Sequence, residues 1–308
     1  MNLTVGTRGS RLSLSQTNAV TQMLEQHFPG LKVETKVIVT TGDKLWDKPF
    51  LQVSTVGMFE KEIDCAVISG EVDFAVHSMK DLPIEDSEEL TLAAVPKREP
   101  ANDVLISNNH LKLADLPADS LVATGSPRRK AQLLRVRPDL KVSSLRGNID
   151  TRMKKAGEGV FAATILAEAG LKRLGMREMV TERLSLESFT PSAGQGALAI
   201  VAKAGRSEVV DVLRSVNDSS SMAEVAAERA FAQRIGGGCK VPMGVVAHSE
   251  RGNLTLYGSI LSPDGKIEIH KSQEGDICSP KELGIRVATK MLDEGIDSLL
   301  EKWRGMNE

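Results

Sequence analysis

Short apolar runs alternate with amphipathic helical segments along the first half of the chain, and few architectures accommodate that order. The apolar runs at 3–7, 33–39 and 72–78 are predicted strands, and the segments at 10–27 and 58–68 are predicted helices between them. Strands that alternate with helices of this length are typical of α/β folds with a largely parallel sheet. The first part of the chain therefore predicts an α/β domain.

A second series of the same kind follows a charged segment with two prolines, VPKREPAND at 95–103. Its predicted strands lie at 102–107, 121–126, 141–145 and 161–166. Because a charged, proline-containing segment is typical of a crossing between domains, the second series predicts a second α/β domain.

The pattern changes beyond Gly238, where hairpin-like strands replace the alternation. Strands are predicted at 245–249, 254–261 and 266–271, with the turn SPDG before the last of them, and a helix is predicted at 279–303. This order of elements predicts a small α+β domain in the last part of the chain.

The stretch GGGCKVP at 236–242 places Cys239 directly after three glycines. The preceding helix is expected to begin with a capping box at 221–224 and to end at the glycines, which puts the thiol just past a helix C-terminus. A run of glycines marks a tight bend or the close approach of a bulky group, so this pattern favours a presented thiol. A buried cysteine that acts as a small hydrophobe fits the stretch equally well.

The 308 residues are 41% hydrophobic and 26% charged, a composition typical of a globular protein of about two or three domains. The sequence has no secretory leader pattern and no long apolar run, so we expect a cytoplasmic protein that does not span a membrane.

Three cysteines, Cys65, Cys239 and Cys278, are far apart, which argues against disulfides. The histidines are scattered, so no metal site is expected.

Positive charge is concentrated in the middle of the chain. Residues 97–173 carry fifteen Lys and Arg against eight Asp and Glu, although the net charge of the whole chain is −2. A basic segment inside a near-neutral protein predicts an anionic ligand. One Tyr and two Trp leave few stacking platforms for nucleic acid, so the composition favours a small polyanion.

Two arginine clusters follow predicted strands of this segment. In GSPRRKAQ, Ser126 is the expected N-cap of a helix, so Arg128 and Arg129 lie beside unpaired backbone N–H groups. In SLRGNIDTR, Arg146 follows a strand and Arg152 lies about a turn and a half later. Guanidinium groups placed in this way predict sites for carboxylates or phosphates, and a solvated helix face is the alternative.

The stretch HSMKDLP at 77–83 places Lys80 and Asp81 at the end of a strand, where open α/β sheets bind ligands. His77 and Ser78 are not expected to act as a nucleophile and its base, because successive strand residues point to opposite faces. Asp81 is the candidate catalytic group, since a carboxylate beside arginines stays ionised and stabilises a cationic intermediate. An ordinary salt bridge is the alternative.

Eight blocks carry a resemblance to a known family. They are TRGSRLSLSQ (7–16), TTGDK (40–44), HSMKDLP (77–83), GSPRRKAQ (125–132), SLRGNIDTR (144–152), AGLKRLG (169–175), PSAGQGALAI (191–200) and AERAFAQRIGGGCKVP (227–242). Their order and spacing resemble the porphobilinogen deaminase family, also called hydroxymethylbilane synthases, over nearly the whole chain.

The resemblance implies a transferase of tetrapyrrole biosynthesis, the route to haem, sirohaem, chlorophyll and cobalamin. It implies that four porphobilinogen molecules are condensed head to tail into the linear hydroxymethylbilane, with release of ammonia at each addition. It also implies a dipyrromethane cofactor attached by a thioether to Cys239, with room for the pyrrole methylene provided by the glycines. Asp81 matches the family's catalytic aspartate, which offsets the positive charge formed when ammonia leaves, and Lys80 lies beside it.

The resemblance further assigns binding residues, because each pyrrole carries an acetate and a propionate. The positions that match cofactor binding are Lys80, Asp81, Ser126, Arg128, Arg129, Arg146 and Cys239. The positions assigned to substrate binding are Arg8, Ser10, Phe59, Arg146, Arg152, Arg173 and Gln195.

The implied architecture is two α/β domains like those of periplasmic binding proteins and a smaller C-terminal α+β domain that carries the cofactor. The expected boundaries are 1–96 with 195–216 for domain 1, 97–194 for domain 2 and 217–308 for domain 3. Gln195 lies between two glycines, which suits a hinge or an interdomain contact, and a tight turn is the alternative.

One stretch departs from the family pattern. In LQVSTVGMFEK at 51–61, Gln52 and Val56 stand where many members carry lysines, so charge is lost over the expected active-site cleft.

Two other functions remain open on the sequence alone, namely a non-catalytic anion-binding module on the same scaffold and a nucleic-acid-binding protein. The expected partners are porphobilinogen and uroporphyrinogen III synthase, which would take up the product. We expect no nucleic-acid partner and a monomeric chain.

Overall fold

The structure is a computed structural model, and it describes residues 1–40, 61–85, 87–145, 147–157, 159–236, 241–296 and 299. The chain divides into two compact units, Met1–Glu99 with Ala197–Met222 and Pro100–Gly196 with Ala223–Glu308. The chain therefore leaves the first unit, returns to it once, and then continues in the second. The division into three domains stays a prediction.

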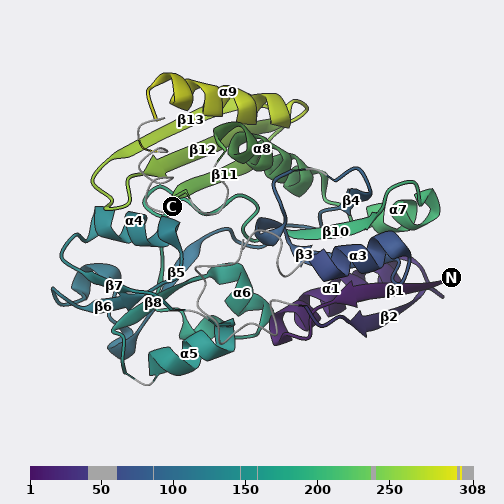
Figure 1. The fold of residues 1–308 in the computed structure, drawn as a ribbon, viewed down its shortest axis with the longest axis horizontal. Helices are drawn as coiled ribbons and strands as arrows, with labels where there is room; N and C mark the ends of the chain where they lie inside the picture. The colour runs from purple at the N-terminus through teal and green to yellow at the C-terminus, as the bar shows by residue number, and fades with distance from the viewer. Residues whose placement is uncertain are drawn as a thin grey trace. The chain divides into compact units, whose positions relative to one another are not determined.

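The first unit is built around a five-stranded sheet with the order β2-β1-β3-β10-β4 (Figure 1). Its strands are β1 (Asn2–Thr7), β2 (Lys32–Val37), β3 (Phe74–Ser78), β4 (Leu90–Ala94) and β10 (Leu198–Lys203). β1 pairs in parallel with β2 and β3, whereas β10 runs antiparallel to β3 and β4. The sheet is largely parallel, as predicted, and its reversed strand is the first one after the chain returns.

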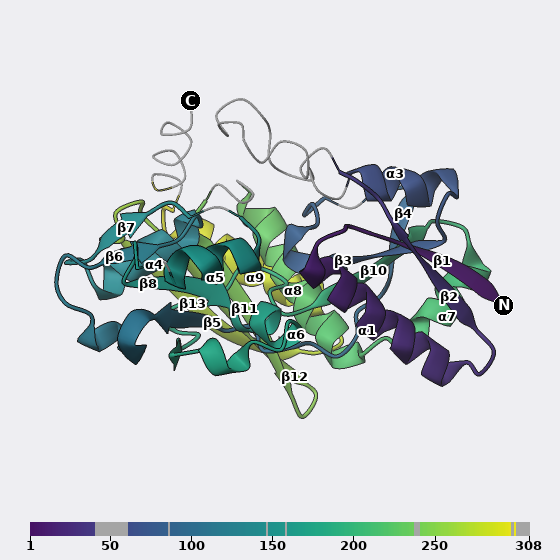
Figure 2. The same ribbon diagram turned by 90° about the horizontal axis from the view of Figure 1, so that it is seen from below.

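Helices cover both faces of this sheet (Figure 2). α1 (Arg11–His27) and α7 (Ser207–Arg214) pack on one face, and α3 (Lys61–Ser69) packs on the other. Phe74 lies in the apolar cluster with α1 and α7, while its neighbour Ala75 lies in the cluster with α3. Because strand side chains alternate between faces, a strand covered on both sides has an unbroken apolar run such as FAV.

The second unit contains a sheet of the same topology, with the order β7-β6-β8-β5-β9. Its strands are β5 (Asp103–Ser107), β6 (Leu121–Ala123), β7 (Lys141–Ser143), β8 (Ala163–Ala167) and β9 (Glu182–Arg183). β6 pairs in parallel with β7 and β8, and β5 runs antiparallel to β8 and β9. Here too the reversed strand is the first one after the chain enters the unit.

Helices again cover both faces of the second sheet. α4 (Pro127–Val136) packs on one face through Leu133, which lies in the cluster with Leu105 of β5. α5 (Ile149–Gly157) and α6 (Glu168–Arg173) pack on the other face. Since residues 103 and 105 of β5 share a face, the side chain of residue 103 is directed toward α4.

The last part of the chain forms an antiparallel sheet of β11 (Met243–Glu250), β12 (Asn253–Leu261) and β13 (Glu268–Asp276). α8 (Ser219–Ile235) precedes it, and α9 (Pro280–Asp293) follows it and packs on β12 and β13. The predicted α+β character of this part is confirmed. No helix within the described ranges is long and apolar enough to span a membrane.

The predicted capping box at the start of α8 is wrong. The helix begins at Ser219, before the predicted box, and the carboxylate of Asp218 accepts the N–H of Ser221 at 2.7 Å. The hydroxyl of Ser221 instead accepts the N–H of Arg98 at 2.9 Å, and Glu224 accepts the N–H and hydroxyl of Ser249. Both residues of the predicted box thus bind partners far away in sequence, which a local motif does not reveal.

The predicted end of α8 is confirmed for the residues that the structure describes. The helix ends at Ile235, and Gly236 follows with φ of 74°. This left-handed conformation is the usual end of a helix and favours glycine.

Candidate functional site

Lys80 and Asp81 lie on a single turn of 3-10 helix, Met79–Asp81, that follows β3 directly. Met79 is buried and donates its backbone N–H to the carbonyl of Ala197 at 3.1 Å, which fixes the turn at its first residue. Asp81 is exposed and Lys80 is half-buried. The fold therefore presents the carboxylate of Asp81 at the carboxyl edge of the first sheet.

The two residues before this turn point to opposite faces of the sheet, as predicted. Nε2 of His77 lies 3.3 Å from Oδ1 of Asp64 on α3. Oγ of Ser78 accepts a hydrogen bond from Nε2 of Gln16 on α1 at 2.9 Å. Each side chain thus contacts the helix on its own face, and the pair does not form a catalytic relay.

Arg8 and Ser10 lie in the connection between β1 and α1. Ser10 is the N-cap of α1, and its hydroxyl accepts the backbone N–H of Ser13 at 3.2 Å. Both predicted residues are half-buried. Their assignment to substrate binding stays a prediction.

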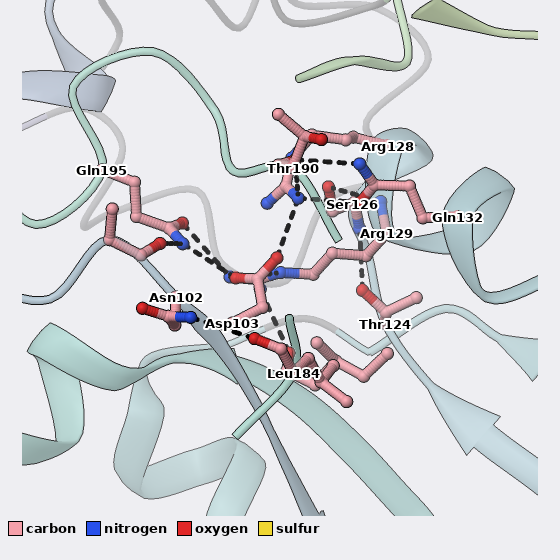
Figure 3. A network of polar contacts seen from close by, with 12 residues as sticks. Asn102, Asp103, Thr124, Ser126, Arg128, Arg129, Gln132, Leu184, Thr190 and Gln195 are labelled. Carbon is pink, nitrogen blue, oxygen red and sulfur yellow. Dashed lines mark hydrogen bonds and ion pairs between the residues drawn. The ribbon is translucent and has the colours of Figure 1, made fainter. Parts of the chain in front are cut away.

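Arg128 and Arg129 are buried in the second unit, each no more than 6% exposed, so the alternative of a solvated helix face is wrong. Both contact Asp103, which is completely buried (Figure 3). Nη1 of Arg128 lies 2.8 Å from Oδ2 of Asp103, and Nη2 of Arg129 lies 2.7 Å from Oδ1. Ser126 is the N-cap of α4, as predicted, and accepts the N–H of Arg129 at 3.4 Å.

Neutral groups complete the hydrogen bonding of the two guanidinium groups. Nη1 of Arg128 also donates to Oε1 of Gln132 at 2.9 Å and to the carbonyl of Thr190 at 2.8 Å. Nη1 of Arg129 donates to the carbonyl of Ile165 at 3.1 Å. These acceptors come from α4, β8 and the segment after β9, so three parts of the second unit hold the arginines in place.

Gln195 joins the same network. Its Nε2 donates to Oδ1 of Asp103 at 2.9 Å and to the carbonyl of Ala101 at 2.6 Å. It is 1% exposed, and its N–H donates to the carbonyl of Ser192 at 3.0 Å. The tight turn and a buried contact therefore coexist at this position.

The charges of this network do not balance. Burial by itself would raise the pKa of Asp103, but the two arginines outweigh burial and hold that pKa well below its usual range. Burial lowers the pKa of Arg128, and Asp103 opposes this shift. At neutral pH the network holds two cations and one anion. Because buried charges are ordinarily paired, the surplus positive charge suits one ligand carboxylate.

Arg152 and Arg173 lie on other elements of the second unit. Nε of Arg152, on α5, donates to the carbonyl of Gly147 at 2.8 Å. Nη2 of Arg173, at the end of α6, donates to the carbonyl of Gly196 at 2.6 Å. Arg173 thus contacts the residue that follows Gln195, while Arg152 contacts the loop just before its own helix.

Several predicted features lie outside the described residues, namely Cys239, Arg146, Phe59 and residues 51–60 of the divergent stretch. The other two cysteines, Cys65 on α3 and Cys278 before α9, are exposed.

Asp103, the centre of the network, is not among the site residues predicted from the sequence. Its signal was nevertheless available, because Asp103 begins the apolar run DVLIS and lies two residues before the core residue Leu105. A carboxylate at a core position of a strand predicts a buried cationic partner.

The fold and this network together define an α/β protein with a buried cluster of two arginines and one aspartate. Residues 3–211 match the family model "Porphobilinogen deaminase, dipyromethane cofactor binding domain", and residues 222–293 match "Porphobilinogen deaminase, C-terminal domain". The chain belongs to the porphobilinogen deaminase family.

Curated relatives agree with the family models. The chain is 43% identical to the "Probable porphobilinogen deaminase" of Nitrosopumilus maritimus, over 99% of this chain and 97% of the relative. It is also 43% identical to the "Porphobilinogen deaminase" of Roseiflexus castenholzii, over 97% and 98% of the two chains. Among solved structures, the methionine binding protein MetQ is similar with a TM-score of 0.43 at 14% identity, over 74% of this chain and 94% of that one.

Proposed function

We propose that this chain catalyses the porphobilinogen deaminase reaction, the stepwise head-to-tail condensation of four porphobilinogen molecules into hydroxymethylbilane with release of ammonia. Its family membership over nearly the full length makes it a transferase of tetrapyrrole biosynthesis. The structural observation that supports this function is the buried pair of arginines with surplus positive charge, which suits a substrate and cofactor rich in carboxylates.

The described residues fit a dipyrromethane cofactor. Its pyrroles carry acetate and propionate groups, and Arg128 and Arg129 supply a buried site with one uncompensated positive charge. The residues that would hold the group are Lys80, Asp81, Ser126, Arg128, Arg129, Arg146 and, through a thioether, Cys239. When bound, the dipyrromethane supplies the pyrrole end on which the new chain is built.

Asp81 is the proposed catalytic residue. Its exposed carboxylate stands on a turn that begins at the buried Met79, whose N–H donates to the carbonyl of Ala197. A fixed carboxylate accepts a hydrogen bond from the pyrrole N–H of porphobilinogen and offsets the positive charge that develops when ammonia leaves. Lys80 beside it suits a carboxylate of the same pyrrole.

The remaining proposed residues bind the carboxylates and ring of porphobilinogen. They are Arg8, Ser10, Phe59, Arg146, Arg152, Arg173 and Gln195. Guanidinium groups from several elements suit a product whose number of carboxylates grows with each addition.

The linear product requires an enzyme that closes the ring, and we assign that step to uroporphyrinogen III synthase as the recipient. The odd number of widely separated cysteines supports a reducing compartment, the cytoplasm. We also propose that the chain acts as a monomer.

Intact-protein mass combined with an assay of porphobilinogen consumption tests the proposed function. Protein made in a porphobilinogen-producing host should exceed its sequence mass by one dipyrromethane and should consume porphobilinogen. An unmodified mass together with no consumption would refute the enzyme and leave an anion-binding module.

A further inference from the structure

Arg128 makes all its hydrogen bonds from one side of its guanidinium group. Nη1 donates to Asp103, Gln132 and Thr190 at 2.8 to 2.9 Å. Within the described residues, no acceptor is hydrogen-bonded to Nε or Nη2. One edge of the group is therefore fixed and the other is available.

Arg129 differs from its neighbour, because all three of its nitrogens donate to the protein. Nε and Nη2 both donate to Oδ1 of Asp103, at 3.1 and 2.7 Å. Nη1 donates to the carbonyl of Ile165 at 3.1 Å. Two adjacent arginines of one motif thus have different roles in the structure.

Asp103 divides its oxygens between the two arginines in a way that produces this difference. Oδ1 accepts three hydrogen bonds, two from Arg129 and one from Gln195 at 2.9 Å. Oδ2 accepts one, from Nη1 of Arg128 at 2.8 Å. Asp103 cancels one of the two buried positive charges. We assign the charge that remains to Arg128, because its Nε and Nη2 have no acceptor among the described residues.

We propose that Asp103 is the positioning residue of the cofactor site, which presets Arg128 so that its Nε and Nη2 edge binds one carboxylate of the dipyrromethane. This inference rests on the proposed function. Two N–H donors on one edge of a guanidinium group match the two oxygens of a carboxylate. Arg129, whose three nitrogens all donate to the protein, holds Asp103 in place for this role.

The amide variant Asp103→Asn tests the role, because it keeps the shape and removes the charge. Its NH₂ group faces a guanidinium whichever way the amide is turned, so the edge of Arg128 is no longer fixed. We expect the fraction of protein that carries the cofactor mass to fall by at least about tenfold, as for the loss of a charge-assisted hydrogen bond. The matched control is Asp139→Asn, at an exposed Arg137–Asp139 pair beyond the other end of α4.

A double variant that keeps the net charge of the wild-type network shows whether Asp103 acts by positioning Arg128 or only by packing. Arg129→Gln brings the net charge of the network from one to zero, whereas Asp103→Asn with Arg129→Gln restores it to one. If the net charge of the network decides whether Arg128 binds a carboxylate, the double variant should carry more cofactor than Arg129→Gln alone. If the residues act only through packing, losses should accumulate and the double variant should carry less. This comparison holds even where Asp103→Asn alone does not fold.

Loading is read from intact mass after expression in the producing host and after incubation of cofactor-free protein with porphobilinogen. Low loading of Asp103→Asn, full loading of Asp139→Asn and partial recovery in the double variant support the inference. Full loading of a folded Asp103→Asn, or a double variant below Arg129→Gln, overturns it. An unmodified wild-type protein refutes the proposed function instead, so the two failures are distinguishable.

Discussion

At the scale of single residues, burial decides the consequence of an ion pair in this protein. Asp103 and Asp139 both accept two hydrogen bonds from an arginine on or beside α4, but Asp103 is completely buried and Asp139 is not. An exposed pair contributes little to stability, whereas removal of one member of a buried pair leaves an uncompensated charge. Sequence motifs show the arginines in both places and do not distinguish them.

Replacement of Asp81 by asparagine should separate catalysis from cofactor attachment. The amide keeps the size of the side chain but lacks the negative charge that stabilises the cation formed when ammonia leaves. Turnover should therefore fall by about a hundredfold or more. Steady-state assays measure the turnover, and intact mass should still show the cofactor. Turnover close to that of the wild type would rule out the catalytic role.

The cofactor attachment predicted for Cys239 depends on the nucleophilicity of the thiol. A serine hydroxyl is hardly ionised at neutral pH, so Cys239→Ser should remain unmodified or load very poorly, and Cys239→Ala should not load. Intact mass of the purified variants measures the loading.

The other two cysteines provide the controls for this experiment. Cys65→Ala and Cys278→Ala should both retain the added mass, although both thiols are exposed. An adduct that disappears from either control while Cys239→Ala keeps it would place the attachment elsewhere.

At the scale of elements, close backbone contacts fix how the last sheet packs within the second unit. The turn between β12 and β13 lies against α4, where a Cβ atom on Gly265 would come within 2.7 Å of the backbone nitrogen of Arg135. Glu268, just after this turn, accepts from Nε of Arg135 at 3.0 Å and from the hydroxyl of Ser259 at 2.9 Å. The helix that begins at the paired arginines is thus held at its far end by the last sheet.

Two glycines in hairpin turns offer a matched test of this contact. Gly252 and Gly265 both have positive φ, 86° and 72°, but only Gly265 has neighbours within 4 Å of an added Cβ. Gly252→Ala should lower the free energy of unfolding by about 1 kcal/mol, because alanine disfavours this backbone conformation. Gly265→Ala should cost about 1–3 kcal/mol more, because α4 must move.

Urea denaturation of both alanine variants measures the difference in the free energy of unfolding. Equal losses for the two variants would show that the turn does not depend on its contact with α4.

At the scale of the whole molecule, the two α/β sheets share one topology, yet they carry different chemistry. The first presents Asp81 on an exposed turn at a strand end, and the second buries Asp103 under the start of α4. The same topology thus carries an exposed carboxylate in one unit and a completely buried carboxylate in the other.

Acid should destabilise the second unit in a manner that depends on Asp103. Its folded-state pKa lies below the ordinary value, so the ionised form stabilises the fold. This stabilisation is complete above the ordinary aspartate pKa of about 4 and is lost as the pH falls toward the lower folded-state value. Unfolding midpoints measured from pH 5 downward should therefore fall more steeply in the wild type than in Asp103→Asn.

The control for the acid experiment is Asp119→Asn, which removes an exposed ion pair with Lys141. Exposed pairs contribute little, so this variant should keep the steep fall of the wild type. An Asp103→Asn variant with an equally steep fall would contradict the assignment.

The sequence by itself indicated the family, through the resemblance of its eight blocks. It also determined the α/β class, most of the strands and the cap of α4. These follow from periodicity and from local hydrogen bonds, such as that of Ser126 to a residue three positions later, and both are written in neighbouring residues. The opposite faces of His77 and Ser78 followed from the same alternation.

Only the tertiary structure decided which polar residues are buried together. Asp103 meets Arg128 and Arg129 from 25 and 26 positions away, and Gln195 reaches the same carboxylate from 92 positions away. The true start of α8 was also decided in this way, because Ser221 and Glu224 bind distant partners. Such contacts depend on how strands are ordered in a sheet, which local periodicity does not specify. Burial then turns an ordinary ion pair into the centre of a buried polar network.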